Sequence, residues 1–231
     1  MKTPAWNPRD FDPEWPFDLL ATEFALNANS TALLIVDMQY NGLRSPLQPK
    51  LAQRAPKVAE YWSSRIEGGV VPNIRNLIDC FRSWRGRIVY TRNGNLTSTG
   101  DEVTARLKAR SGQFKHPDRN EDYAIDARIA PADEDLVVDK LTSGAFTASL
   151  LDHALRNMGI KSLVITGILT DMCILGTARA ASELGYNSLI CEDACATLTA
   201  RAHLEALLMH ARVFGRVAAT VDVLAELGGV G

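Results

Sequence analysis

Short runs of β-branched and aliphatic residues alternate along the chain with stretches in which apolar residues recur every three or four positions. The apolar runs predict strands over residues Thr31–Val36, Ile88–Thr91, Leu136–Val138, Ser162–Thr166, Asn187–Cys191 and Arg216–Thr220. The helical spacing predicts helices over residues Val71–Arg85, Thr147–Met158, Asp171–Gly185 and Arg201–Ala211. Strands that alternate with helices in this way are typical of a parallel sheet covered on both faces. We therefore expect an α/β fold, a three-layer sandwich with helices on both faces of a six-stranded, mostly parallel sheet.

The segments between these elements differ in character. Residues 1–29 predict an irregular N-terminal arm, and residues 30–231 predict a single domain, because no repeat or linker divides them. Residues 38–66 are expected to form a long connection that ends in a weak helix. Residues 93–134 are polar and lack periodicity, and so long a connection is typical of an active-site or interface loop.

Composition narrows the functional classes. The 231 residues include 25 basic and 27 acidic side chains, so a net charge of −2 provides no strong field for nucleic acid or an anionic membrane. No apolar stretch has the length of a membrane span, and the N-terminal residues lack the apolar core of a signal peptide. The four cysteines form no C-x-x-C pair, which is typical of reduced thiols. We expect a cytoplasmic protein that binds neither nucleic acid nor membranes.

Three chemically complementary side chains follow predicted strands. Asp37 and Lys140 each stand at the end of a strand, and Cys173 lies in the first turn of a helix that follows another. The carboxyl ends of parallel strands meet at one sheet edge, where sites gather. Backbone N–H groups and the helix dipole at such a turn favour a thiolate. Asp37 would take the thiol proton, Lys140 would hold its neighbours in their charged forms, and backbone amides would receive an oxyanion.

Each of these residues also has an ordinary structural interpretation. A free cysteine is among the most buried residue types, so Cys173 is also compatible with simple packing of a helix against the sheet. Asp37 is also compatible with capping a loop, and Lys140 with a solvated surface charge. The functional hypothesis depends on all three occurring at matching strand ends.

Three motifs, in this order, carry a resemblance to a known family. They are ALLIVDMQ at Ala32–Gln39, VVDKLTSGAF at Val137–Phe146 and TGILTDMC at Thr166–Cys173, with CEDA at Cys191–Ala194 as a further match. Across residues 31–220 the chain resembles the isochorismatase-like cysteine hydrolases. The resemblance implies a catalytic triad of Asp37, Lys140 and Cys173. It also implies a cis peptide at Ile168–Leu169 and an oxyanion hole formed by the amides of Leu169 and Cys173, although many members have alanine where this chain has Leu169.

The same resemblance narrows the reaction. The zinc-binding branch of the family carries an Asp and two His shortly after the first motif, but residues 38–72 contain no His, and the four histidines of the chain lack metal-ligand spacing. We therefore expect no metal and no cofactor. Retention of Cys173 favours acyl chemistry at a C–N bond. This implies the non-zinc amidohydrolase branch, whose members act on N-carbamoylsarcosine, ureidoacrylate or biuret-type substrates through a thioester-type acyl-enzyme and release ammonia or an amine.

Further residues are candidates for binding a small-molecule substrate. Gln39, Arg92 and Asn93 lie just past strand ends and offer polar groups for a carboxylate or ureido group, while Tyr40 and Phe146 offer walls for a pocket. Ordinary loop polarity, or a structural role for Phe146, explains these residues equally well.

Two other functions and the state of assembly stay open at this point. One alternative is a vinyl-ether hydrolase of the isochorismatase type in which Asp37 acts as the acid. The other is a non-catalytic binding protein on the same fold. The apolar arm, the long loop and the resemblance together predict a homodimer or homotetramer.

Overall fold

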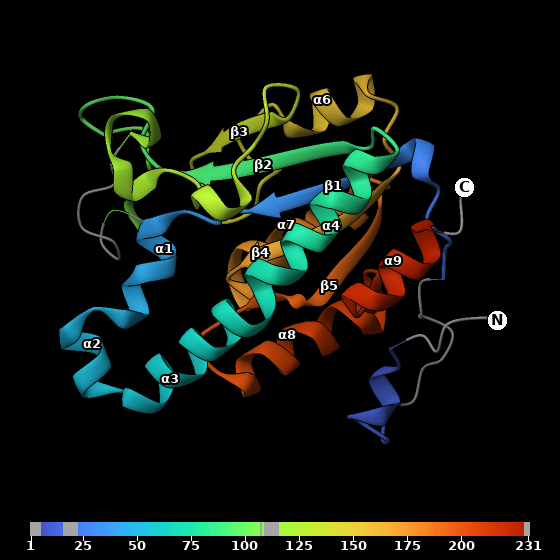
Figure 1. Ribbon diagram of the computed structural model, residues 1–231, viewed down its shortest axis with the longest axis horizontal. Helices are drawn as coiled ribbons and strands as arrows, with labels where there is room; N and C mark the ends of the chain where they lie inside the picture. The colour runs from blue at the N-terminus through green and yellow to red at the C-terminus, as the bar shows by residue number, and fades with distance from the viewer. Residues whose placement is uncertain (1–5, 16–22, 107, 109–115, 229–231) are drawn as a thin grey trace.

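The computed structural model describes residues 6–15, 23–106, 108 and 116–228, and its centre is a six-stranded sheet (Figure 1). The strands are β1 (Thr31–Val36), β2 (Arg87–Asn93), β3 (Leu136–Lys140), β4 (Ser162–Ile168), β5 (Asn187–Ala196) and β6 (Arg216–Ala218). Their order is β3-β2-β1-β4-β5-β6, and each neighbouring pair is parallel. The predicted parallel sheet is confirmed. The strand order reverses between β1 and β4, and a crevice for a ligand forms at such a switch point.

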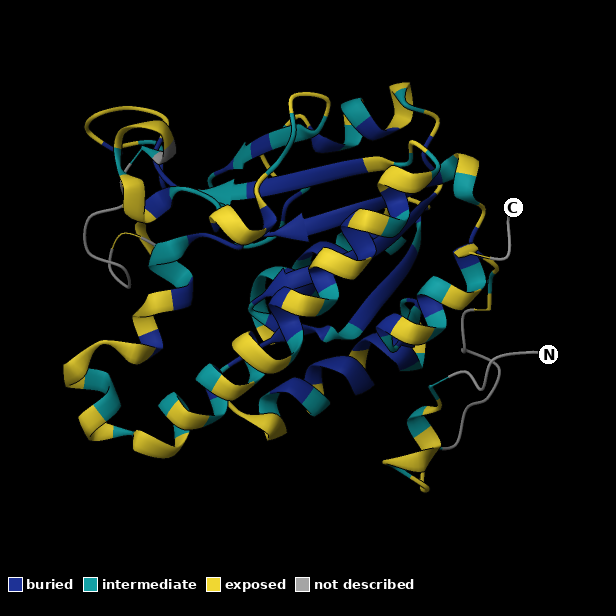
Figure 2. Cartoon of the chain, in the orientation of Figure 1, coloured by how far each residue is buried: buried dark blue, intermediate teal, exposed yellow. Residues whose placement is uncertain are grey.

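Helices cover the sheet on both sides. The helices α3 (Pro56–Arg65), α4 (Val71–Ser83) and α9 (Thr220–Gly228) contribute to one core, and α6 (Leu151–Asn157), α7 (Leu175–Glu183) and α8 (Ala200–Val213) contribute to the other. Residues of β1 alternate between the two cores, with Leu33 and Ile35 in the first and Leu34 and Val36 in the second. The sheet is accordingly buried, and exposed residues lie on the outer sides of the helices (Figure 2). The predicted three-layer arrangement is confirmed.

The connection over residues 38–66 ends in a helix, as expected, but the expectation that the rest of it is irregular is wrong. The segment contains α1 (Tyr40–Arg44), α2 (Pro49–Arg54) and α3, followed by a π-helical turn at Ile66–Val70. Prolines open α2 and α3 because their fixed φ suits a first helical turn. Trp62 of α3 is fully buried, and its indole N–H donates to the carbonyl oxygen of Leu43 at 2.8 Å. A single buried aromatic side chain therefore ties α3 back to α1.

Among the predicted boundaries that differ from the structure, two bear on the position of the site. The helix expected from Thr147 begins only at Leu151, because Ala148 has a φ of 54° and the hydroxyl of Thr142 donates to the carbonyl of Thr147 at 3.1 Å. The strand expected to end at Cys191 continues to Ala196, with a register irregularity against β4. Both differences lie close to the carboxyl edge of the sheet.

The described parts of the two irregular segments lie against the body of the protein. In the N-terminal arm, Asp12 accepts a hydrogen bond from Arg212 of α8, whose guanidinium lies 4.7 Å from the ring centroid of Trp15. In the polar loop after β2, Ile125 forms a β-bridge with Gln39. That loop therefore runs beside the carboxyl end of β1. Among the described residues, no helix is both long enough and apolar enough to cross a membrane.

Gly167, near the end of β4, lies where the backbones of two central strands approach each other closely. Its φ is +114°, and a Cβ atom there would lie 2.1 Å from the carbonyl oxygen of Val36 on β1. Because both strands are central, neither backbone can move away. We expect Gly167→Ala to lower the free energy of unfolding by about 3 kcal/mol or more, measured by urea denaturation.

Gly68→Ala is the matched control, because a Cβ at Gly68 would meet nothing within 4 Å. This helical position should tolerate alanine or gain a little stability. If both variants unfolded at the same urea concentration, the close approach of β4 to β1 would not be what excludes a side chain at residue 167.

Candidate active site

Three side chains meet at the carboxyl edge of the sheet. The Nζ atom of Lys140 lies 2.7 Å from Oδ2 of Asp37 and 3.7 Å from Sγ of Cys173. Asp37 directly follows β1, Lys140 ends β3, and Cys173 lies in the π-helical turn Thr170–Ile174 between β4 and α7. The structure thus brings together the carboxylate, the ammonium group and the thiol that the sequence placed at strand ends.

The buried ammonium group of Lys140 has protein partners in place of water. The side chain is 0% exposed, and Nζ also donates to the carbonyl oxygens of Thr142 at 2.9 Å and Ser143 at 3.0 Å. Burial alone would lower the pKa of Lys140, but the Asp37 carboxylate and the Cys173 sulfur outweigh burial, so the pKa lies above its ordinary value. Lys140 is therefore a fixed positive charge inside the site, and the interpretation as a solvated surface lysine is wrong.

Cys173 is a thiol in the resting protein. Burial and the nearby carboxylate of Asp37 raise its pKa to about 12, against the opposite effect of Lys140. A backbone N–H of the turn does lower the pKa, but burial and the carboxylate outweigh it, so the net expectation of a thiolate is corrected. The carboxylate of Asp37 and the thiol contact the same ammonium group, which places Asp37 near the proton of the thiol.

The backbone of the same turn also faces the sulfur. The peptide bond between Ile168 and Leu169 is cis, at the position that the family resemblance implies. The N–H of Leu169 acts on the sulfur of Cys173 so as to lower the pKa of the thiol, and the carbonyl of Leu169 accepts from the amides of Met172 at 3.0 Å and Ile174 at 3.1 Å. At least one backbone donor thus points to the place where a substrate carbonyl would meet the thiol.

Thr91 of β2 is a site residue that the sequence reasoning missed. Its hydroxyl donates to Oδ1 of Asp37 at 2.8 Å, while Oδ2 of the same carboxylate faces Lys140. The carboxylate is therefore held in one orientation by two partners. The available signal was the hydroxyl residue at the end of the predicted strand Ile88–Thr91.

Two of the expected substrate-binding side chains are engaged with the protein itself. The amide nitrogen of Gln39 donates to the carbonyls of Asn93 and Tyr123, and its amide oxygen accepts from the N–H of Asn93 at 2.7 Å. Arg92 forms a bidentate pair with Asp139 at 2.8 and 2.9 Å and donates to Asp118 at 2.6 Å. Gln39 and Arg92 therefore hold loops in place, and the expectation that they meet substrate is not supported by their contacts.

The other three expected substrate-binding residues, Tyr40, Asn93 and Phe146, lie in three different environments. Phe146 packs against the second core and lies 5.6 Å, centroid to centroid, from the ring of Tyr186. The hydroxyl of Tyr40 accepts from the amide of Ala127, and its side chain lines a cavity of about 350 Å³ beside α1 and α3. Asn93 is paired in register with Lys140, so both side chains leave the same face of the sheet. Its Oδ1 is buried and has no hydrogen-bond partner among the described residues.

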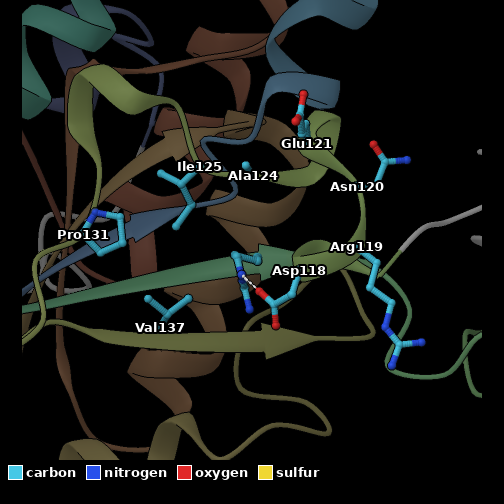
Figure 3. A pocket seen from close by; sticks show the side chains of 9 residues that line it. Asp118, Arg119, Asn120, Glu121, Ala124, Ile125, Pro131 and Val137 are labelled. Carbon is cyan, nitrogen blue, oxygen red and sulfur yellow. Dashed lines mark hydrogen bonds and ion pairs between the residues drawn. The ribbon is translucent and has the colours of Figure 1, made fainter.

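A second hollow, of about 570 Å³, is larger than the cavity beside Tyr40 and is lined by residues of β2, β3 and the loop after β2 (Figure 3). Ile125, Pro131 and Val137 form its apolar side, while Asp118 and Arg119 lie toward its other end. Residues 137 and 140 are an odd number of positions apart on β3, so this hollow is on the opposite face from the ammonium group of Lys140. Across the described ranges, no three His, Cys, Asp or Glu side chains cluster so as to hold a metal ion.

The fold and the three side chains at the sheet edge define the class of protein, an α/β protein in which a buried ammonium group contacts both a carboxylate and a thiol. A model of the isochorismatase domain matches residues 31–222. The chain is 31% identical to ureidoacrylate amidohydrolase RutB of Variovorax paradoxus over 218 residues, which cover 86% of this chain and 81% of that protein. The chain therefore belongs to the isochorismatase family, and it is a hydrolase.

Solved structures show the same fold. A cysteine hydrolase from Pseudomonas syringae pv. phaseolicola matches with a TM-score of 0.75 and 20% identity over 92% of this chain and 99% of that one. N-carbamoylsarcosine amidase from Thermoplasma acidophilum matches with a TM-score of 0.61 and 24% identity over 83% of this chain and 96% of that one. At these identities the similarity establishes the architecture.

Replacing Asp37 by asparagine tests whether this carboxylate raises the pKa of the Cys173 thiol. The change removes the carboxylate that raises the pKa of Cys173, while Lys140 stays 3.7 Å from the sulfur. The pKa of Cys173 should therefore fall. We expect iodoacetamide to alkylate Cys173 at least about tenfold faster than in the wild type at neutral pH, measured by mass spectrometry of the cysteine-containing peptide.

Asp139→Asn is the matched control, because this carboxylate lies at the same sheet edge but pairs with Arg92. In the Asp139→Asn variant, Cys173 should be alkylated at the wild-type rate. Slower alkylation in Asp37→Asn than in the wild type would contradict the electrostatic role of Asp37.

Proposed function

We propose that this hydrolase is a cysteine-dependent amidohydrolase that cleaves a C–N bond in a small carbamoyl, ureido or amide substrate. The observation that carries the proposal is the contact of Lys140 with both Asp37, at 2.7 Å, and Cys173, at 3.7 Å. The name of the ureidoacrylate amidohydrolase that is 31% identical over most of this chain supports the same reaction class.

The proposed reaction begins with the resting thiol. Asp37 accepts the proton of Cys173 as the sulfur attacks the carbamoyl or amide carbon. The backbone amides of Leu169 and Cys173 stabilise the oxyanion. Asp37 then gives its proton to the departing ammonia or amine, which leaves a thioester on Cys173. Water, activated by the same carboxylate, hydrolyses the thioester and restores the thiol.

Lys140 has an electrostatic part in this scheme. When the proton moves from Cys173 to Asp37, negative charge moves from the carboxylate to the sulfur, and both atoms lie close to the same ammonium group. The positive charge therefore stabilises the site before and after the transfer and needs no rearrangement, which is the condition for electrostatic catalysis. The free Oδ1 of Asn93 is our candidate acceptor for an N–H of the carbamoyl or amide group.

The arrangement favours this chemistry over the two alternatives. Protonation of a vinyl ether needs an acid but has no use for a thiol that contacts the same ammonium group as that acid. A binding module has no use for a lysine that is 0% exposed between a carboxylate and a thiol, since such a charge carries a desolvation penalty. Acyl transfer uses all three groups.

Hydrolysis of a substrate panel tests the proposal. We expect the purified protein to release ammonia from at least one compound among ureidoacrylate, N-carbamoyl amino acids, biuret-type ureas and simple amides. Cys173→Ala and Cys173→Ser should each lower kcat by at least about 10⁴-fold, because both remove the attacking sulfur. Circular dichroism should show an unchanged fold.

Cys80→Ala is the matched control, because this half-buried thiol lies on α4 and not at the sheet edge that carries Asp37, Lys140 and Cys173. It should retain wild-type turnover. Amide hydrolysis by Cys173→Ala would remove the thiol from the mechanism, and near-wild-type activity of that variant on isochorismate would select the vinyl-ether reaction instead.

A further inference from the structure

A buried polar chain that the mechanism does not use ends at the turn that carries the nucleophile. Thr170 directly follows Leu169 and is fully buried, and its Oγ1 lies 2.8 Å from Nδ1 of His203 on α8. On the other side of the ring, Nε2 of His203 lies 2.9 Å from Nη2 of Arg65 on α3. The chain thus links two helices from opposite faces of the sheet to the peptide unit next to Leu169.

The chemistry of Arg65 determines which nitrogen of His203 carries the proton. A guanidinium group only donates hydrogen bonds, so Nε2 must accept from Arg65 through its lone pair. In a neutral imidazole the proton is then on Nδ1, which donates to Oγ1 of Thr170. The hydrogen bonds therefore have a single direction, from Arg65 through His203 to Thr170.

Arg65 itself is held in place by β5. Its side chain donates to the carbonyl of Cys195 at 3.1 Å, to the carbonyl of Glu192 at 2.5 Å and to the carboxylate of Glu192 at 3.1 Å. The same carboxylate is 3.7 Å from Nε2 of His203, which is longer than a hydrogen bond. The imidazole is thus fixed by a guanidinium group that cannot easily turn away.

We propose that His203 is a positioning residue for hydrolysis, whose Nδ1–H, through Thr170, holds the N–H of Leu169 on the reacting atoms. The peptide unit between Leu169 and Thr170 is planar, so it fixes the Cα atom of Leu169 relative to Thr170, and that Cα atom carries the N–H of Leu169. A second tether, from the hydroxyl of Thr197 to the carboxylate of Asp171 at 2.6 Å, holds the next residue of the turn. The role in hydrolysis rests on the proposed function.

Two substitutions of His203 separate positioning from packing. Asparagine places an amide N–H near the position of Nδ1 and retains the donor to Thr170, whereas glutamine reaches the position of Nε2 and retains only the acceptor for Arg65. We expect His203→Gln to lower kcat by about tenfold with KM changed less than about twofold, because the donor to an oxyanion acts mainly in the transition state. His203→Asn should keep kcat within about threefold of the wild type.

His210 provides the matched control. It is another buried histidine on α8, but its Nε2 faces the carbonyl of Ser188 on β5 at 3.2 Å and not a residue of the nucleophile turn. His210→Gln should leave kcat unchanged even where it lowers the melting temperature. Equal losses of kcat in His203→Gln and His203→Asn, or no loss in either, would overturn the proposal.

Thr170→Val is the second test, should His203→Gln fail to fold, because valine has nearly the shape of threonine but no hydroxyl. It should lower kcat as His203→Gln does, and Thr170→Ser should restore it. Full activity of Thr170→Val would contradict the proposal.

Alkylation of Cys173 supplies a readout that needs no substrate. The N–H of Leu169 favours the thiolate, so its misalignment should slow alkylation by iodoacetamide by about threefold in His203→Gln and Thr170→Val. A merely loosened fold would expose the sulfur and accelerate the reaction. If the wild type hydrolyses nothing in the panel but alkylation slows as expected, the proposed function fails and the positioning role stands. Unchanged or faster alkylation in both variants overturns the positioning role.

Discussion

The buried ion pair between Lys140 and Asp37 is the interaction on which the rest of the site depends. An ammonium group that is 0% exposed has lost its water, and this penalty must be offset by an opposite charge and by hydrogen bonds. Asp37 supplies the charge, and the carbonyl groups of Thr142 and Ser143 supply the bonds. Because these partners follow β1 and β3, the pair can form only in the assembled sheet. The sulfur of Cys173 then lies among charges that are already in place.

The sheet explains why the nucleophile stands beside this pair. The strand order reverses between β1 and β4, so the turn after β4 opens next to Asp37. Gly167 lets the two backbones approach closely just before that turn, and hydrogen bonds from Thr197 and His203 hold the turn from the side of β5 and α8. The sheet thus sets the place of the thiol, while contacts distant in sequence set the orientation of the turn.

The position of a side chain at a strand end could be predicted from the sequence, whereas its contacts with loops could not. Asp37, Lys140 and Cys173 could be grouped because the ends of parallel strands must meet, whatever the loops do. The roles expected for Gln39 and Arg92 were not supported, because their partners lie in the loop after β2 and at the end of β3. A polar side chain at a strand end serves a substrate only when no loop reaches it first, and periodicity does not encode the path of a loop.

The sequence by itself therefore determined the layers of the fold, the strands and the chemical groups gathered at their ends, because hydrophobic periodicity and residue type are local properties. Only the tertiary structure decided the charge states and partners of those groups. Burial and the carboxylate of Asp37 raise the pKa of Cys173, and Nε2 of His203 lies 2.9 Å from the guanidinium group of Arg65. Those distances join residues far apart in the chain, and they exist only after folding.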